Sequence, residues 1–364
     1  MNSLPDKKRI LALSGGGVRG IVEVAFLEAV EAAYRRRHGP DTQLSDVFHL
    51  IGGSSTGALI ATALSLGKPM SDIRDFYLTR AAGFFSNRRW WRVGRAPMFD
   101  CDALEAEVRR DVGDMTLGDP ALRTYLAIIL KRFDTGTPWI VNNLPDAPYF
   151  KDLGDGRFRG NEHYQLARLL RGTTAAPFFF SQELIELAPG APPGVFVDGG
   201  LSPYNDPSLA LLKLARMQAF GLKWPLGAEQ MFILSVGSGR LRPKIKPNRA
   251  ATMGPLQVAL ASLRGVLTDN EQMTLTMMEW MGQSSAPSHI NSEVGHLGED
   301  SLTDAPLFEF LRLDLPLEKG GAMGLSASDA HRFSRMDDPS IIAPLYDLAQ
   351  EYCAQTWDLD ALLG

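Results

Sequence analysis

A single serine stands at the centre of a glycine-bounded turn near the start of the chain. Residues 53–57 read Gly-Ser-Ser-Thr-Gly and fit the G-x-S-x-G pattern, with Ser55 in the middle. The two flanking glycines leave room for a sharp strand-to-helix turn. Ser55 would then begin a helix, whose positive dipole end favours developing negative charge. The pattern predicts a nucleophilic serine, although a plain glycine- and serine-rich turn has the same composition.

A second glycine-rich stretch lies further upstream. Residues 14–20 read Ser-Gly-Gly-Gly-Val-Arg-Gly, between an apolar strand expected at 9–13 and a buried helix expected at about 21–36. Backbone amides in such a turn can converge on an anion. The stretch has no Walker lysine and is not a clean G-x-G-x-x-G, so we expect it to hold an oxyanion rather than a phosphate. Its Arg19 either anchors the loop, attracts an anionic head group or lies on the surface.

A carboxylate ends a third stretch. Residues 194–200, Gly-Val-Phe-Val-Asp-Gly-Gly, predict a buried strand that finishes at Asp198. Ligands bind at the carboxyl ends of strands in open α/β sheets. Asp-Gly is also a common turn pair, and alone that interpretation would be preferred. Beside a candidate nucleophile, however, Asp198 becomes the natural base.

The elements that must position these groups alternate between strands and helices. The first two units, residues 9–36 and 47–66, each read as strand, turn and helix, which favours a parallel sheet covered by helices. We therefore predict a three-layer α/β/α fold with a central, mostly parallel sheet. Further strands are expected at 125–130, 139–141, 230–236 and 307–313, and further helices at 164–171, 208–220, 271–281 and 340–357.

Composition limits the classes of function. The chain has 364 residues, a net charge of −5, 45% hydrophobic and 22% charged residues, so no global basic signal for a nucleic-acid polymer exists. Cys101 and Cys353 lie far apart, which predicts neither a disulfide framework nor a metal cluster and favours a reducing cytoplasm. No apolar run reaches the ~18 residues of a membrane-spanning helix. Any membrane contact would be peripheral, and no cofactor is expected.

Two aromatic stretches allow a lipid-related interpretation beside a structural one. Residues 83–92 combine four aromatic residues with three arginines, which suits an interfacial anchor or an aromatic lid packed on the body. Residues 178–180 are three phenylalanines, which suit an acyl-chain pocket or, more commonly, the core.

The order of glycine-rich loop, serine turn and Asp-Gly-Gly resembles the patatin-like phospholipase family. The resemblance rests on residues 15–20, 53–57 and 198–200, and covers roughly residues 9–240. The chain departs from the family pattern at Ser14, where an aspartate is common, and at Asp206, which replaces the second asparagine of Asn-Asn-Pro.

The resemblance implies a patatin-like fold in one catalytic domain over residues 1–364, with the motifs within about 9–240 and a helical C-terminal part over about 241–364. It implies a Ser–Asp dyad without histidine, an acyl-enzyme on the serine, a lipid or phospholipid substrate, and no metal. The residues it marks are Ser55 and Asp198 as the catalytic pair, Gly15, Gly16, Gly17, Val18, Arg19 and Gly20 as the oxyanion hole, Gly53 and Gly57 as the nucleophile elbow, and Gly199 and Gly200 after the aspartate.

Three alternatives stay open from the sequence. A histidine could join the serine in a Ser-His-Asp esterase or thioesterase; the histidines are His38, His49, His163, His289, His296 and His331. The first glycine-rich loop could instead serve a non-enzymatic nucleotide-binding module. Finally, some bacterial patatin-like enzymes look like effectors that degrade membranes once a signal nucleotide binds. The sequence predicts no oligomeric state.

Overall fold

The fold is organised around one sheet of eight strands. The computed structural model describes residues 7–84, 99, 101–152, 154, 156–177, 179–241, 245–298, 300–318, 320 and 323–363. The strands follow the order β5-β6-β3-β2-β1-β7-β8, with β4 paired to β3. Their bounds are β1 (Lys8–Leu13), β2 (Leu50–Ser54), β3 (Tyr125–Arg132), β4 (Thr137–Asn142), β5 (Glu183–Ile185), β6 (Gly194–Asp198), β7 (Met231–Val236) and β8 (Glu309–Leu313).

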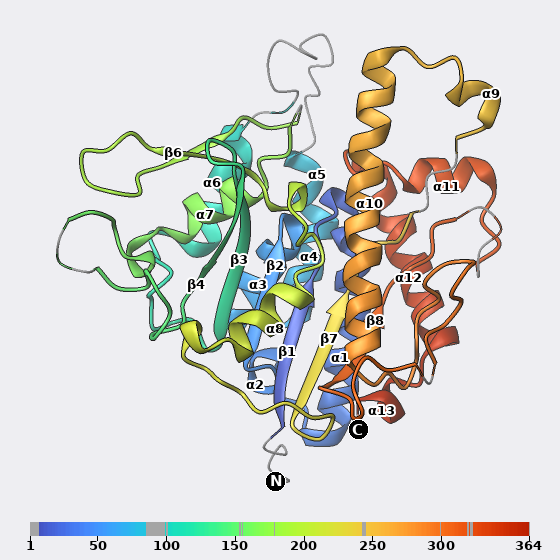
Figure 1. Ribbon diagram of the computed structural model, residues 1–364, viewed down its shortest axis with the longest axis horizontal. Helices are drawn as coiled ribbons and strands as arrows, with labels where there is room; N and C mark the ends of the chain where they lie inside the picture. The colour runs from blue at the N-terminus through green and yellow to red at the C-terminus, as the bar shows by residue number, and fades with distance from the viewer. Residues whose placement is uncertain are drawn as a thin grey trace.

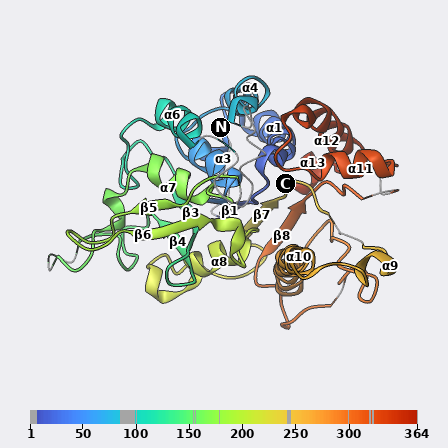
Figure 2. The same cartoon turned by 90° about the horizontal axis from the view of Figure 1, so that it is seen from above.

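Helices cover both faces of this sheet. Seen from above, α8 and α10 lie on one face, and α1, α3, α4 and α12 lie on the other (Figure 2). The α-helices are α1 (Gly20–His38), α2 (Leu44–Val47), α3 (Thr56–Ser65), α4 (Met70–Thr79), α5 (Ala81–Phe84), α6 (Cys101–Val112), α7 (Leu166–Thr173), α8 (Ser208–Arg216), α9 (Pro247–Ala250), α10 (Pro255–Met281), α11 (Ala327–Phe333), α12 (Ile342–Thr356) and α13 (Leu359–Leu362). The predicted three-layer α/β/α architecture is confirmed. Within the described ranges, no helix combines the length and the apolar character that crossing a bilayer requires.

The central strand β1 is buried on both faces. Successive side chains of a strand point to opposite faces, so Leu11 and Leu13 pack in one apolar cluster while Ile10 and Ala12 pack in the other. This explains the uninterrupted apolar run in the sequence, which is typical of parallel strands covered on both sides. The strands β3, β2, β1, β7 and β8 all run parallel, as predicted.

Two strands run against the predicted parallel direction. Both β4 and β6 are antiparallel to β3, and β5 is antiparallel to β6. The sheet is therefore parallel in its body and antiparallel on its β3 side. The sequence pattern could not predict this, because a short buried strand has the same composition in either direction.

Three predicted boundaries are wrong. The helix expected at 208–220 ends at Arg216 as α8, and a separate 3-10 turn covers Gln218–Phe220. The strand expected at 47–51 begins only at Leu50, because the preceding residues form the short helix α2, where the Gln43 amide donates to Asp46 Oδ2 at 2.9 Å. The helix expected at 271–281 is the second half of α10, which begins with Pro255, a residue suited to a first helical turn. Of the aromatic and arginine stretch at 83–92, residues 85–92 lie outside the described ranges.

Candidate active site

Ser55 sits on a strained turn between β2 and α3. Its backbone has φ 52° and ψ −125°, a region that residues other than glycine rarely adopt. A Cβ at Gly53 would lie 2.2 Å from the carbonyl carbon of Gly57, and one at Gly57 would lie 2.5 Å from the carbonyl oxygen of Leu13. Gly53 is therefore needed for close packing of the turn against its own helix α3, and Gly57 for close packing of α3 against the end of β1.

The strand β3 brings Ser55 and the distant Asp198 together. On one edge, β3 pairs with β4 over Ala127 to Arg132, so its other edge must serve both β2 and β6. There β2 ends with Ser54 opposite Ile129, and the antiparallel β6 ends with Asp198 opposite Leu130. The two strands thus meet tip to tip along β3. Asp198 reaches the carboxyl edge of the parallel strands as predicted, but it arrives from the opposite direction.

The two side chains are joined by a hydrogen bond. Ser55 Oγ donates to Asp198 Oδ2 at 2.7 Å, and the Gly200 amide donates to Asp198 Oδ1 at 2.7 Å. Both side chains are buried. Burial raises the pKa of Asp198 to about 6, although the hydrogen bonds from Ser55 and Gly200 act in the opposite direction. Asp198 is thus mostly ionised at neutral pH and a stronger base than a free aspartate.

Thr173, at the end of α7, fixes the backbone of Ser55 by a hydrogen bond. The Ser55 amide donates to Thr173 Oγ1 at 2.9 Å, and Thr173 Oγ1 donates to the carbonyl oxygen of Ile129. This hydroxyl links the serine turn to β3. The sequence pattern did not single out Thr173. The only signal was the run of small residues at 172–176, where α7 ends.

Most backbone amides of the glycine-rich loop after β1 already donate hydrogen bonds to other groups of the chain. The Gly15 amide donates to Asn205 O at 3.3 Å, the Gly16 amide to Thr56 Oγ1 at 3.1 Å, and the Val18 amide to Met336 O at 3.0 Å. The amides of Arg19 and Gly20 close the short 3-10 turn. Among loop residues 15–20, only Gly17, at φ 61°, has a backbone amide without a hydrogen-bond partner in the described part of the chain. Gly17 is therefore the loop residue whose amide remains available to a bound anion. The amide of Thr56, the first residue of α3, also has no partner among the described residues.

Arg19 is buried rather than on the surface. Its Nη1 donates to Gly239 O at 3.1 Å, which ties the loop to the turn after β7. Burial lowers the pKa of this guanidinium, while Glu271, Asp314 and Glu23 oppose the shift. Of the two functional interpretations of Arg19, the structure supports loop anchoring.

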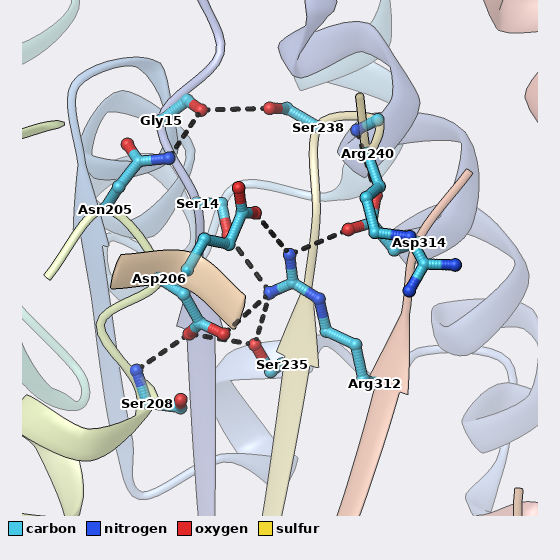
Figure 3. A network of polar contacts seen from close by, with 12 residues as sticks. Ser14, Gly15, Asn205, Asp206, Ser208, Ser235, Ser238, Arg240, Arg312 and Asp314 are labelled. Atoms are coloured by element: carbon cyan, nitrogen blue, oxygen red, sulfur yellow. Dashed lines mark hydrogen bonds and ion pairs between the residues drawn. The ribbon is translucent and has the colours of Figure 1, made fainter. Parts of the chain in front are cut away.

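The same loop rests on a buried polar network (Figure 3). The carbonyl oxygen of Gly15 accepts from Ser238 Oγ at 2.9 Å and from Asn205 Nδ2 at 3.4 Å. Beside it, the guanidinium of Arg312 donates to Ser14 Oγ at 3.1 Å and to Asp206 Oδ2 at 3.0 Å. Further partners of Arg312 are Ser235, Asp314 and Glu271.

An apolar pocket opens on Ser55 and Asp198. Its walls include Leu59, Phe76, Ala81, Leu104, Phe179 and Phe180. Two of the three phenylalanines at 178–180 thus line the pocket, and Phe178 lies outside the described residues. All six histidines are among the described residues, and none of them lines this pocket. The geometry offers Ser55 a carboxylate and an apolar channel.

Comparisons with known proteins match the chain to one family. A model of the patatin-like phospholipase family matches residues 11–212. A cGAMP-activated phospholipase of Vibrio cholerae is 27% identical over 229 residues, covering 59% of this chain and 60% of that protein. Patatin-like protein 1 of Oryza sativa is 25% identical over 253 residues, covering 63% and 58%. The match thus spans about three fifths of these relatives' length. A solved structure of human GIVD cytosolic phospholipase A2 aligns with a TM-score of 0.43 and 12% identity, covering 98% of this chain and 60% of that one.

Proposed function

The chain belongs to the patatin-like phospholipase family, and from this premise we propose that it is a serine acyl hydrolase that cleaves fatty-acyl esters of phospholipids or related lipids. The observation that carries the proposal is the 2.7 Å hydrogen bond from Ser55 Oγ to Asp198 Oδ2 at a strained strand-to-helix turn. A hydroxyl becomes a nucleophile when an adjacent base can take its proton.

The proposed reaction has two halves. Asp198 accepts the proton of Ser55 while Oγ attacks the ester carbonyl, and the amides of Gly17 and Thr56 stabilise the resulting oxyanion. The carbon–oxygen bond to the leaving alcohol breaks, and the proton held by Asp198 passes to that alcohol. The acyl group remains on Ser55. A water molecule that gives its proton to Asp198 then attacks the acyl-enzyme, and the fatty acid leaves as Ser55 is reprotonated.

The pocket supports an acyl chain as the part of the substrate that binds. Its walls are mainly apolar side chains, including Leu59, Phe76 and Phe179, and Ser55 and Asp198 are among its polar lining residues. An extended alkyl chain would gain roughly 0.8 kcal/mol for each buried methylene group. The ester group would lie in the pocket beside Ser55 and Asp198.

A fluorophosphonate probe tests the reaction class directly. The probe should label the wild-type chain, and peptide mapping should place the label on Ser55. Ser55→Ala and Asp198→Asn should both lose labelling, whereas Ser54→Ala should keep it. Ser54 is the matched control because it is the neighbouring buried serine and its hydroxyl has no partner within the described residues. Labelling that mapped to another residue would refute the proposal.

A second candidate adds a trigger to the same chemistry. Two relatives, at 27% and 25% identity, carry the name cGAMP-activated phospholipase. If hydrolysis by this chain is gated in the same way, cyclic GMP-AMP should raise the rate of phospholipid hydrolysis at least tenfold over the rate without nucleotide. Equal rates with and without nucleotide would leave the ungated hydrolase as the function.

A further inference from the structure

The first half of α10 is an apolar helix that the described part of the chain leaves largely uncovered. Leu256 is 73% exposed, Leu263 is 47% exposed and Val266 is 53% exposed. Over residues 255–267 the only charged side chain is Arg264. Leu256, Leu260, Leu263 and Leu267 recur at intervals of four, three and four, which aligns them on one helical face. A helix of this composition can bury these side chains only by contact with a surface outside the described residues.

This half of α10 projects past the edge of the sheet that carries the active site. Glu271 Oε1 accepts from Arg312 Nη2 at 3.1 Å, and Arg312 lies one residue before the carboxyl end of β8. The other end of α10 lies at the start of β8, where the Gln283 amide donates to Phe308 O. Pro255 precedes Glu271 by 16 residues (271 − 255), so the helix extends about 24 Å further at ~1.5 Å per residue. Figure 1 shows α10 rising beside and beyond the strands.

Ser55 and Gly17 lie at the same edge, because they follow the carboxyl ends of β2 and β1. A surface that contacted the first half of α10 would therefore approach the side of the molecule on which the pocket lies. The face of α10 that bears Glu271 and the buried Met278 lower down continues as the leucine face higher up. These leucines thus point over the edge of the sheet.

Positive charge accompanies this helix. Between Gln230 and Thr268 the chain has no aspartate or glutamate, and its basic residues there are Arg240, Arg242, Lys244, Lys246, Arg249 and Arg264. Lys246, Arg249 and Arg264 are exposed. Lys246 precedes α9 and Arg249 lies in it, at the same end of the molecule as the start of α10 (Figure 1). The chain as a whole carries a net charge of −5, so this basic cluster runs against the overall charge.

We propose that residues 245–267 form a docking surface for the anionic face of a phospholipid bilayer, with the leucines of α10 inserted among the head groups and Lys246, Arg249 and Arg264 paired with phosphates. An apolar helical face beside basic residues is the composition of interfacial membrane-binding helices. The apolar segment of 13 residues is too short to span a bilayer, so it lies in the interface. This inference rests on the proposed function, because docking would present bilayer lipids to the pocket.

Charge disfavours a second copy of the chain as the occupant. A two-fold contact would place the same patch of each copy against the other. Lys246, Arg249 and Arg264 of one copy would then approach their own counterparts, and like charges repel. Anionic phosphates complement the same residues instead.

Vesicle co-sedimentation tests the surface separately from catalysis. The full chain carries Ser55→Ala, so that hydrolysis does not alter the vesicles. It is mixed with vesicles of phosphatidylcholine alone or of phosphatidylcholine with phosphatidylglycerol. We expect preferential binding to the anionic vesicles, and a decrease with added salt. Leu256→Asp with Leu263→Asp should lower the partition by at least about tenfold. Lys246→Glu with Arg249→Glu should lower, by about tenfold, the ratio of binding to phosphatidylglycerol-containing vesicles over binding to phosphatidylcholine vesicles.

Matched controls lie at the far end of the molecule. Leu302→Asp alters a leucine that is 45% exposed and whose amide donates to Trp280 O, near the end of α10. Lys68→Glu with Lys223→Glu reverses two exposed lysines at the amino edge of the sheet, with the same change in net charge. Both controls should bind as the parent chain does.

Hydrolysis of a soluble short-chain ester separates this inference from the proposed function. With Ser55 restored, the α10 variants should hydrolyse this ester at the parental rate. If the chain with Ser55 bound vesicles normally but hydrolysed no ester, the proposed hydrolase function would be refuted and the docking surface would not. Vesicle binding that stayed unchanged in the α10 variants would refute the docking surface. A leucine variant that bound vesicles normally but changed the molecular mass measured by light scattering would also refute it, because that result assigns the helix to a contact with a second copy.

Discussion

The carboxyl group of Asp198 holds its proton more tightly than a free aspartate, because burial disfavours its charge and raises its pKa to about 6. In the proposed mechanism only the ionised form can accept the proton of Ser55. We therefore predict that kcat/KM for a soluble ester rises with pH through about 6 and levels off near neutrality. A pH–rate profile checks this prediction, and a rate that was highest at pH 5 would contradict it.

The same shift predicts a stability effect with a defined sign. Between pH 3.8 and about 6 the folded chain binds the Asp198 proton more tightly than the unfolded chain, so stability falls as pH rises through this window. The full loss, roughly 3 kcal/mol, is present above it. Asp198→Asn removes the loss but gives up one hydrogen-bond acceptor, worth about 1 kcal/mol. At pH 8 we expect the free energy of unfolding of the variant to exceed that of the wild-type chain by about 1–2 kcal/mol. This difference should vanish below pH 3.8. Urea titrations at both pH values measure this difference.

At the residue scale, the sequence could predict which side chains meet but not all that holds them. Ser55 and Asp198 stand in local patterns whose glycines reveal the turns. Thr173 has no such pattern, because its role depends on the end of α7 lying against the serine turn. The glycine loop shows the same limit, since the partners of Gly15 and Gly16 come from Asn205 and Thr56, and spacing alone could not predict them.

At the element scale, the serine turn depends on close contact between β2 and α3. A Cβ at Gly53 would meet the backbone of Gly57 at 2.2 Å, and a backbone atom there cannot move aside as a flexible side chain can. Gly53→Ala should therefore lower the free energy of unfolding by at least about 3 kcal/mol. Gly265→Ala is the control, because that glycine lies in α10 with open space around it, and alanine should add up to about 1 kcal/mol there. Thermal unfolding of both variants tests the contrast, which equal melting temperatures would contradict.

Elements that form from continuous sequence were predicted well, and those defined by distant pairing were not. The unit of β1 and α1 follows from one apolar strand, a glycine turn and one buried helix. The position of β6 beyond the end of β2 depends on β4 occupying the other edge of β3, which no local pattern encodes. The length of α10 was underestimated because Asp269 and Asn270, inside the helix, resemble a helix start, although the leucines at 256–267 already have helical spacing.

At the scale of the whole molecule, the C-terminal part completes the sheet that holds the motifs. The strand β8 pairs with β7, and its Arg312 contacts Ser14 and Asp206 in the motif-bearing part and Glu271 in α10. Burial by itself would lower the pKa of Arg312, but Asp314, Asp206 and Glu271 raise it above its usual value. We propose that residues 1–364 fold as one domain, because separating the two parts would expose this buried cation and its carboxylates.

Two departures from the family pattern meet at this guanidinium. Ser14 stands where an aspartate is common, and Asp206 stands where the second asparagine of Asn-Asn-Pro is common, yet both contact Arg312 Nη1. In this chain Asp206 supplies a carboxylate to Arg312 Nη1, and Ser14 supplies a hydroxyl. We predict that Asp206→Asn alone costs about 3 kcal/mol, because it removes one carboxylate from a buried cation. Adding Ser14→Asp should recover most of that loss, although each substitution alone destabilises. Urea unfolding of the two single variants and the double variant gives the coupling energy, and additive losses would show that the two positions act independently.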